Sequence, residues 1–262
     1  IPSFIKPILS PLFARWEKVT GNYFDAIVTA DEEIAKNFRD ISAKLVVLFN
    51  YPRKDVYSSV SDEMRVHKDQ LVAKLIYVGV IRKSRGLWLM LDALKVLVQD
   101  YKANIKLILA GRIPDNYERK RFEILIDRDP ILSGRVEWLG RVLQNSVSRL
   151  LTEADIGWIP LQSIPKFYKN IPTKMFEYMA SCLPIVASDL PPIRQFLDAT
   201  EAGFLVTPGN PASHAHAIYT LLSSPEIMEN MGHRGRKAFL EKYNWENEVK
   251  KLHRLYRSLL ES

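Results

Sequence analysis

Short apolar segments alternate with longer segments of helical spacing along most of the chain. Continuous apolar runs predict strands at 26–30, 45–49, 74–79, 105–111, 135–140, 155–160, 184–188 and 203–206. Helical spacing predicts helices at 86–101, 117–127, 145–152, 173–181, 211–222, 225–242 and 245–260. Repeated strand-then-helix units predict an α/β fold with a doubly wound parallel sheet. Such a sheet is covered on both faces and binds ligands at the carboxyl ends of its strands.

The first fifty residues look different from the rest. Residues 1–50 supply an amphipathic helix, two strands and a short helix at 31–38, which is too little for a domain, so we interpret them as the end of a preceding domain. Residues 51–242 form the predicted ligand-binding domain, in which the polar stretch 51–71 is a linker or exposed loop. In 243–262, a helix with an apolar stripe is expected to pack back toward the preceding domain. Because the chain begins with Ile1, we expect a piece of a longer protein.

Composition narrows the class of protein. The 262 residues are 47% hydrophobic and 26% charged, as in soluble globular domains. A single cysteine, Cys182, excludes an internal disulfide and favours a reducing compartment, and we therefore predict a cytoplasmic protein. The net charge of +7 favours anionic partners, and no apolar run is long enough to cross a bilayer. Since no Lys/Arg stripe is interleaved with aromatic residues, we expect no nucleic-acid partner.

A basic turn follows the predicted strand 74–79. Gly79 ends the strand, and Arg82, Lys83 and Arg85 precede the helix that begins at Gly86. The backbone N–H groups and dipole of that helix favour an anion, and arginine can bind phosphate oxygens in a forked geometry. A diphosphate suits two arginines in so short a loop, although a solvated basic turn is the alternative.

A second candidate segment is the predicted helix at 173–181. It starts after a Pro-Thr signal and places Lys174, Glu177, Tyr178 and Ser181 on one face, which we expect to be reactive or wet. A lysine in the first turn opposes the helix dipole unless an anion lies nearby. The Glu177 carboxylate is suited to accept the paired hydroxyls of a ribose. The alternative is a surface salt bridge between Lys174 and Glu177.

The remaining candidate residues favour structural roles. His214 and His216 are two residues apart on a predicted helix, so they cannot share a metal, and we expect both at the surface. Cys182 is expected to be buried. We predict neither a metal site nor a bound cofactor.

Four stretches, taken in order, resemble one enzyme family. They are 77–87, 108–111 with 136–142, 172–180 with 184–189, and 203–209, and 25–33 adds a weaker match. The sequence resembles the C-terminal half of a retaining, nucleotide-sugar-dependent glycosyltransferase of family 4, whose fold has two Rossmann-like domains (B-type). The resemblance covers nearly the whole chain.

The resemblance implies a role for each matching residue. Arg82 and Arg85 would clamp the donor diphosphate and assist departure of the leaving group, with Lys174 as a further candidate. Glu177 would hold the nucleotide ribose. The other expected donor-binding positions are Gly79, Arg141, Val142 and Thr173.

Two positions depart from the family pattern. Lys169 stands where the family has a glutamate that touches the transferred sugar, and Val80 stands where it has an arginine after the strand glycine. The resemblance therefore implies a phosphate clamp that is shifted onto Arg82, and Lys169 changes the contacts expected to the donor sugar.

The implied activity is transfer of a sugar from a nucleoside diphosphate, UDP or GDP, to a carbohydrate or lipid-linked acceptor. Configuration would be retained and no metal used. Lacking the acceptor-binding domain, residues 1–262 alone are expected to be inactive. A non-catalytic nucleotide-sugar-binding module acting on a partner enzyme is the alternative. The basic amphipathic segment from Phe4 to Phe24 suits the inner face of a membrane, although packing on the missing domain is the alternative.

Overall fold

The computed structural model describes residues 6–60 and 72–261, with the side chains of residues 6–10 left aside. The chain divides into two compact units. The larger unit is Pro52–Asn244, and the smaller joins Ile1–Tyr51 with Trp245–Ser262. The identity of residues 1–50 as the end of an acceptor-side domain stays a prediction.

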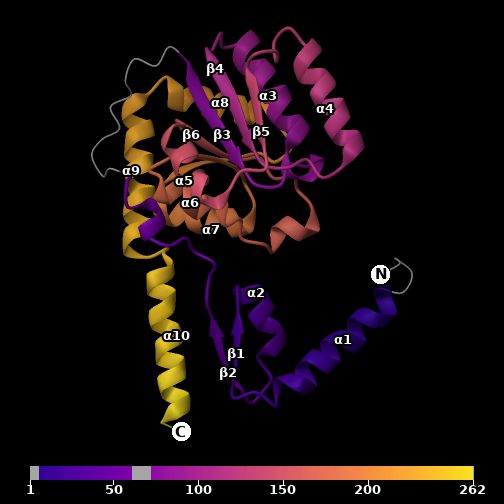
Figure 1. Ribbon diagram of the computed structural model, residues 1–262, viewed down its shortest axis with the longest axis vertical. Coiled ribbons are helices and arrows are strands. Elements are labelled where there is room, and N and C mark those ends of the chain that lie inside the picture. The colour runs from indigo at the N-terminus through magenta and orange to yellow at the C-terminus, as the bar shows by residue number, and fades with distance from the viewer. Residues whose placement is uncertain (1–5, 61–71, 262) are drawn as a thin grey trace. The chain divides into compact units, whose positions relative to one another are not determined.

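The larger unit is built on a six-stranded parallel sheet (Figure 1). Its strands are β3 (Ala73–Val78), β4 (Ile105–Ala110), β5 (Val136–Gly140), β6 (Ile156–Ile159), β7 (Ile185–Ser188) and β8 (Gly203–Val206). Their order across the sheet is β5-β4-β3-β6-β7-β8. The order reverses between β3 and β6, and doubly wound sheets bind ligands at the carboxyl ends of such a switch point. The predicted fold class is confirmed.

Helices cover both faces of this sheet. They are α3 (Leu87–Gln99), α4 (Asn116–Arg128), α5 (Gln144–Thr152), α6 (Lys174–Ala180), α7 (Pro191–Thr200), α8 (Pro211–Leu222) and α9 (Pro225–Glu241). Helix α3 packs against α8 on one face, and α6 packs against α9 on the other (Figure 1). Short 3₁₀ helices lie at η2 (Asp55–Tyr57), η3 (Lys83–Arg85) and η4 (Pro165–Tyr168).

Most of these helices and strands lie where apolar spacing in the sequence predicts them. The predicted face of α3 is fully buried in the core at Leu87, Met90, Leu91, Leu94 and Leu97. Helix α7 was not predicted, although the prolines at its first two positions are a helix-start signal. Its apolar side chains, including Phe196, pack beside Phe176 of α6.

Two predictions about individual segments need correction. The stretch 51–71 is not simply an exposed loop, because Tyr57 and Val60 are buried. Their carbonyls accept hydrogen bonds from Arg236. Residues 61–71 lie outside the described part of the chain. His214 is buried rather than at the surface, and its Nδ1 accepts a hydrogen bond from the Trp158 indole at 3.0 Å. His216 is exposed, and Cys182 is buried, both as predicted.

The smaller unit holds a two-stranded parallel sheet of β1 (Ala26–Thr29) and β2 (Lys44–Val47), with α1 (Lys6–Gly21), α2 (Glu32–Ala35), η1 (Lys36–Phe38) and α10 (Trp245–Leu260). Helix α10 joins the N-terminal segment through hydrogen bonds at both of its ends. Glu248 accepts from the Phe49 amide, and Lys44 donates to the Ser258 carbonyl. Leu255 in the predicted apolar stripe is buried, but Tyr256 is 59% exposed. Among the described residues, no helix has the length and apolar character required to span a membrane.

Candidate functional site

Two cavities lie at the carboxyl ends of the strands in the larger unit. We call the first the Lys174 cavity. It has a volume of about 670 Å³. Its lining comes from the ends of β3, β4 and β5 and from α5 and α6, namely Val78, Gly79, Val80, Arg85, Ala110, Gly111, Arg112, Arg141, Val142, Leu143, Gln144, Val147, Thr173, Lys174 and Glu177. Among the described lining residues, four are basic and one is acidic, so this cavity favours an anion.

Glycines make room for this cavity where β3 and β4 end. A Cβ on Gly111 would lie 1.8 Å from the Gly79 carbonyl oxygen, so only glycine lets the turns after β3 and β4 approach this closely. Gly79 has a φ of +121°, and a Cβ there would lie 3.4 Å from the Lys174 Nζ. Because glycine has no side chain, backbone and cationic groups face the cavity at these two positions. The Trp138 indole donates to the Gly111 carbonyl at 2.7 Å and fixes the end of β4.

Lys174 is the most unusual side chain of the cavity. It is only 7% exposed, and its Nζ has no hydrogen-bond partner within the described parts of the chain. The amine lies 3.4 Å from the centroid of the Tyr77 ring. Burial, reinforced by the nearby Arg85 guanidinium, lowers the pKa of Lys174 well below its usual value, while Glu177 acts in the opposite direction. A buried amine without a partner is costly unless a ligand supplies one.

Glu177 lies one turn after Lys174 on α6. It is partly buried, and burial raises its pKa while Lys174 lowers it. The predicted alternative, a surface salt bridge between the two, is not formed, because Lys174 is buried and unpartnered among the described residues. The expectation of a wet helix face was also wrong, since Tyr178 and Ser181 are fully buried. The face is polar, but it points into the protein.

Tyr178 anchors α6 at the switch point. Its hydroxyl accepts from the Val78 amide at 3.1 Å and lies 3.4 Å from the carbonyl oxygens of Ile76 and Trp158. The hydroxyl thus bridges β3 and β6 beyond their last paired residues. Its ring occupies the space over Gly157, where an added Cβ would come within 2.5 Å of it. Because Glu177 and Lys174 lie on the same short helix as Tyr178, this anchor also fixes their positions.

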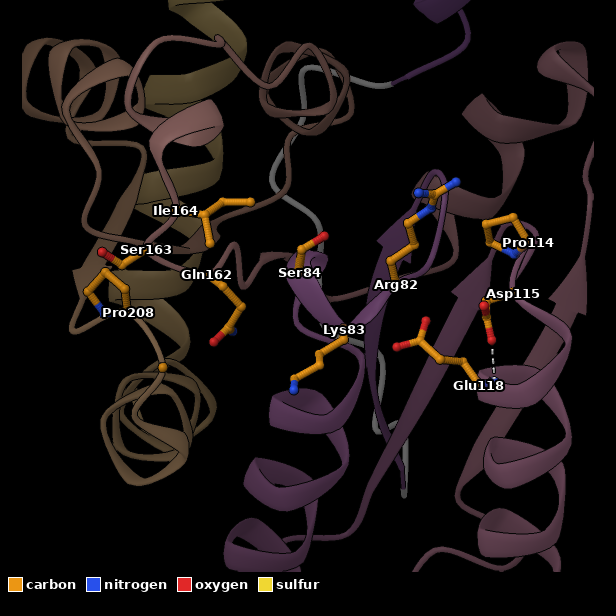
Figure 2. Close-up of a pocket in the computed structure, with 11 residues that line it drawn as sticks. Arg82, Lys83, Ser84, Pro114, Asp115, Glu118, Gln162, Ser163, Ile164 and Pro208 are labelled. Atoms are coloured by element: carbon orange, nitrogen blue, oxygen red, sulfur yellow. Dashed lines mark hydrogen bonds between the residues drawn. The ribbon is translucent and has the colours of Figure 1, made fainter. Parts of the chain in front are cut away.

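The second cavity, which we call the Arg82 cavity, has a volume of about 780 Å³. Its lining is Arg82, Lys83, Ser84, Pro114, Asp115, Glu118, Gln162, Ser163, Ile164, Pro208 and Gly209. Figure 2 shows Arg82 on the same side of this cavity as Pro114, Asp115 and Glu118, with Gln162, Ser163 and Ile164 across from them. Arg82 and Lys83 are exposed. Because two carboxylates line the same cavity, its charge is balanced.

The structure brings together most of the predicted site residues. Arg85 and Lys174 share the Lys174 cavity with Gly79, Arg141, Val142, Thr173 and Glu177. Arg82 does not line it, so the predicted pairing of Arg82 with Arg85 in one cavity is not found. The basic turn contributes to both cavities, because Arg82 and Lys83 line the Arg82 cavity whereas Arg85, at the end of η3, lines the Lys174 cavity. The role of each residue stays a prediction.

Sequence reasoning missed two residues of this site. Arg112 follows Gly111 at the end of β4 and adds a fourth cation to the cavity. A Gly-Arg pair directly after a strand was the available signal. Tyr77 supplies the ring beneath Lys174, but its place within an apolar run hid that role. No cluster of three or more metal-ligating side chains was found in the part of the chain that the structure describes.

The comparisons with known proteins agree with this arrangement. A family model described as "Glycosyl transferases group 1" matches residues 63–238, which include every residue lining both cavities. The chain belongs to the glycosyl transferases group 1 family. The resemblance stated from the sequence is confirmed at this level.

Two curated glycosyltransferases are distant relatives of this chain. An uncharacterized glycosyltransferase of Methanocaldococcus jannaschii is 23% identical, with 71% of this chain matched to 45% of that protein. The phosphatidyl-myo-inositol mannosyltransferase of Mycobacterium leprae is 26% identical, with 72% of this chain matched to 47% of that protein. The chain thus matches about half the length of these relatives.

Solved structures show that the fold is shared. A glycosyltransferase from Rickettsia africae superposes with a TM-score of 0.76 at 15% identity, covering 95% of this chain and 67% of that one. HepE of Anabaena, solved with UDP and glucose, gives a TM-score of 0.71 at 17% identity, covering 94% and 66%. At this identity the likeness establishes the Rossmann-like fold alone.

Proposed function

We propose that this chain supplies the donor-binding part of a retaining glycosyltransferase that uses a nucleoside-diphosphate sugar. The observation that carries the proposal is the Lys174 amine, which is buried beside Arg85 in a cavity at the switch point of the sheet and has no hydrogen-bond partner among the described residues. Phosphoryl oxygens would supply the hydrogen-bond acceptor that Lys174 lacks there and would also accept from Arg85. The UDP bound to HepE, which shares this fold, supports a nucleotide ligand.

The remaining lining residues would bind the ribose and the base of the donor. The Glu177 carboxylate is suited to accept the ribose hydroxyls, and the segment at Arg141 and Val142 would border the base. Arg112 and Arg141 lie exposed at the cavity and add positive charge. The cavity volume of about 670 Å³ is within the range of small-molecule sites.

The proposed chemistry is stabilisation of a leaving group. As the sugar leaves, negative charge develops on the diphosphate, and fixed cations stabilise that charge most where water is excluded. Arg85 and Lys174 would provide this stabilisation without requiring a metal ion. The acceptor would be a carbohydrate or a lipid-linked molecule, and the residues that bind it would lie outside the larger unit.

Calorimetric titration of the 262-residue chain with UDP, GDP, ADP and UDP-glucose tests the proposal. We expect one nucleoside diphosphate to bind, and Arg85→Met or Lys174→Met to weaken that binding by about 1.5–3 kcal/mol, the usual effect of losing a hydrogen bond to a charged group. Lys120→Met, an exposed change on α4, is the matched control and should have no effect. Binding that is unchanged in both cavity variants would contradict the assignment.

A non-catalytic binding module is the second candidate. It is favoured by Lys169, which stands in place of the glutamate expected to touch the donor sugar and is exposed outside the lining of either cavity. The longer protein separates the two candidates. An enzyme would transfer or hydrolyse the sugar of its donor, whereas a binding module would hold the donor without consuming it.

A further inference from the structure

The surroundings of Lys174 bear on its charge before any ligand binds. The side chain is 93% buried, and its amine has no hydrogen-bond partner within the described residues. An ammonium ion in such a place loses its hydration without compensation. The Tyr77 ring face, 3.4 Å away, attracts a cation, but this attraction is smaller than the hydration that burial removes.

The groups facing Lys174 from neighbouring elements add to this cost. From η3, Arg85 places an Nη1 within 4.0 Å of the position that a Gly79 Cβ would occupy, and the Lys174 Nζ lies 3.4 Å from the same point. Arg112 and Arg141, after β4 and β5, line the same cavity. From β3, Tyr77 is a neutral phenol, since burial raises its pKa to about 12. The carboxylate facing the amine is Glu177 of α6 itself, and it offsets these cations only in part.

We infer that the Lys174 amine is neutral in the free protein and takes up one proton from solvent when the diphosphate of the donor binds. The proton adds to the lone pair of Nζ, and no other bond is made or broken. The diphosphate supplies acceptors for the new N–H groups and negative charge that, together with Glu177, offsets the neighbouring arginines. This inference rests on the proposed function.

Linked protonation makes donor affinity depend on pH. If one proton is bound with each nucleotide, affinity falls about tenfold for each pH unit above the pKa that Lys174 has in the free protein. The phosphates of a nucleoside diphosphate complete their ionisation near pH 6. Uracil and guanine lose a ring proton at more alkaline pH, whereas adenine does not, so the slope is measured between about pH 7 and 8.5, where it reports on the protein. The released diphosphate would leave together with the proton, which links product release to pH.

Calorimetry in buffers of different ionisation enthalpy measures the proton directly. The 262-residue chain is titrated with UDP, GDP and ADP at about pH 7, 7.75 and 8.5. We expect proton uptake that approaches one per bound nucleotide, and an affinity that falls with pH. Lys174→Arg keeps a charge that cannot be lost, so it should bind with no proton uptake and a flat pH profile. Lys120→Met should behave like the unchanged chain.

The ¹³Cε signal of Lys174 in a lysine-labelled sample gives a second measurement, assigned by its absence in Lys174→Arg. We expect it to titrate far below pH 10.4, the ordinary value for lysine, in the free chain. Addition of the nucleotide that binds should move this titration upward. Nucleotide binding without proton uptake, or a Lys174 that titrates normally in the free chain, overturns the inference but leaves the proposed function standing. If none of the three diphosphates binds, both fail together.

Discussion

The Lys174 cavity and the Arg82 cavity lie on either side of one turn yet differ in how they hold their charges. In the first, the Lys174 amine is buried and has no partner in the described structure. In the second, Arg82 and Lys83 are exposed to solvent and share the cavity with Asp115 and Glu118. Exposed charges are screened by water, whereas a buried charge is not. The excess of cations and the burial of Lys174 therefore both favour the Lys174 cavity for a phosphate ligand.

The largest effect is expected from closing the Lys174 cavity at its base. Gly111→Ala places a Cβ against the Gly79 carbonyl, and because both atoms belong to backbone, the turns must separate. We expect the free energy of unfolding to fall by about 3 kcal/mol or more, as for severe overpacking, and nucleotide binding to be lost. Denaturant unfolding and calorimetric titration measure the two effects.

Gly134→Ala is the matched control for this substitution. Gly134, unlike Gly111, has a left-handed backbone, with φ of +72°, and no atom lies within 4 Å of the added Cβ among those described. The strain of that conformation costs only about 1–2 kcal/mol, and binding should be kept. Equal losses in both variants would show that the approach of the two turns is not what shapes the cavity.

A fall in pH should destabilise the larger unit as a whole through His214, which is buried on α8, and should therefore affect both cavities alike. Burial lowers its pKa to about 4, so the unfolded chain binds its proton first as the pH falls. Stability conferred by the neutral ring is full above pH 6.5 and is lost toward pH 4, a change of about 3 kcal/mol. His214→Asn places an amide oxygen where the ring has Nδ1, so it keeps an acceptor for Trp158 and should remove this part of the acid sensitivity. Denaturant unfolding of this variant and of the unchanged chain between pH 7 and pH 4 measures the difference, and an equal loss of stability in both would contradict this role of His214.

A smaller effect, specific to the Lys174 cavity, is expected from Tyr178→Phe. Removing the hydroxyl leaves the buried Val78 amide without its acceptor, which costs about 1–3 kcal/mol of stability. The turn after β3 and the start of α6 lose a shared anchor, so nucleotide affinity should fall with little change in the Arg82 cavity. Tyr117→Phe, at a 77% exposed position, is the control. An unchanged affinity in Tyr178→Phe would mean that core packing alone positions α6.

Much of the fold, but only part of the site, could be predicted from the sequence. Apolar runs mark the strands because a doubly wound sheet buries them on both faces, and strands such as β6 and β7 are buried at every residue. Motif order also placed Arg85, Lys174 and Glu177 near one another. Burial of individual polar residues was not predictable. Lys174 and His214 look like surface residues in the sequence, and their enclosure depends on distant elements such as Tyr77 and Trp158.

The smallest effect is expected from Arg82→Met, and it decides between the two cavities. Residue spacing alone favoured Arg82 and Arg85 equally as diphosphate ligands, whereas the fold sends their side chains to different cavities. Because Arg82 is exposed and lies beside Asp115 and Glu118, we expect its loss to change nucleotide affinity by less than about 0.5 kcal/mol, as for most surface charges. Titration of Arg82→Met beside Arg85→Met measures the difference. Should Arg82→Met weaken binding more than Arg85→Met, the donor would belong in the Arg82 cavity, and the buried amine of Lys174 would need another explanation.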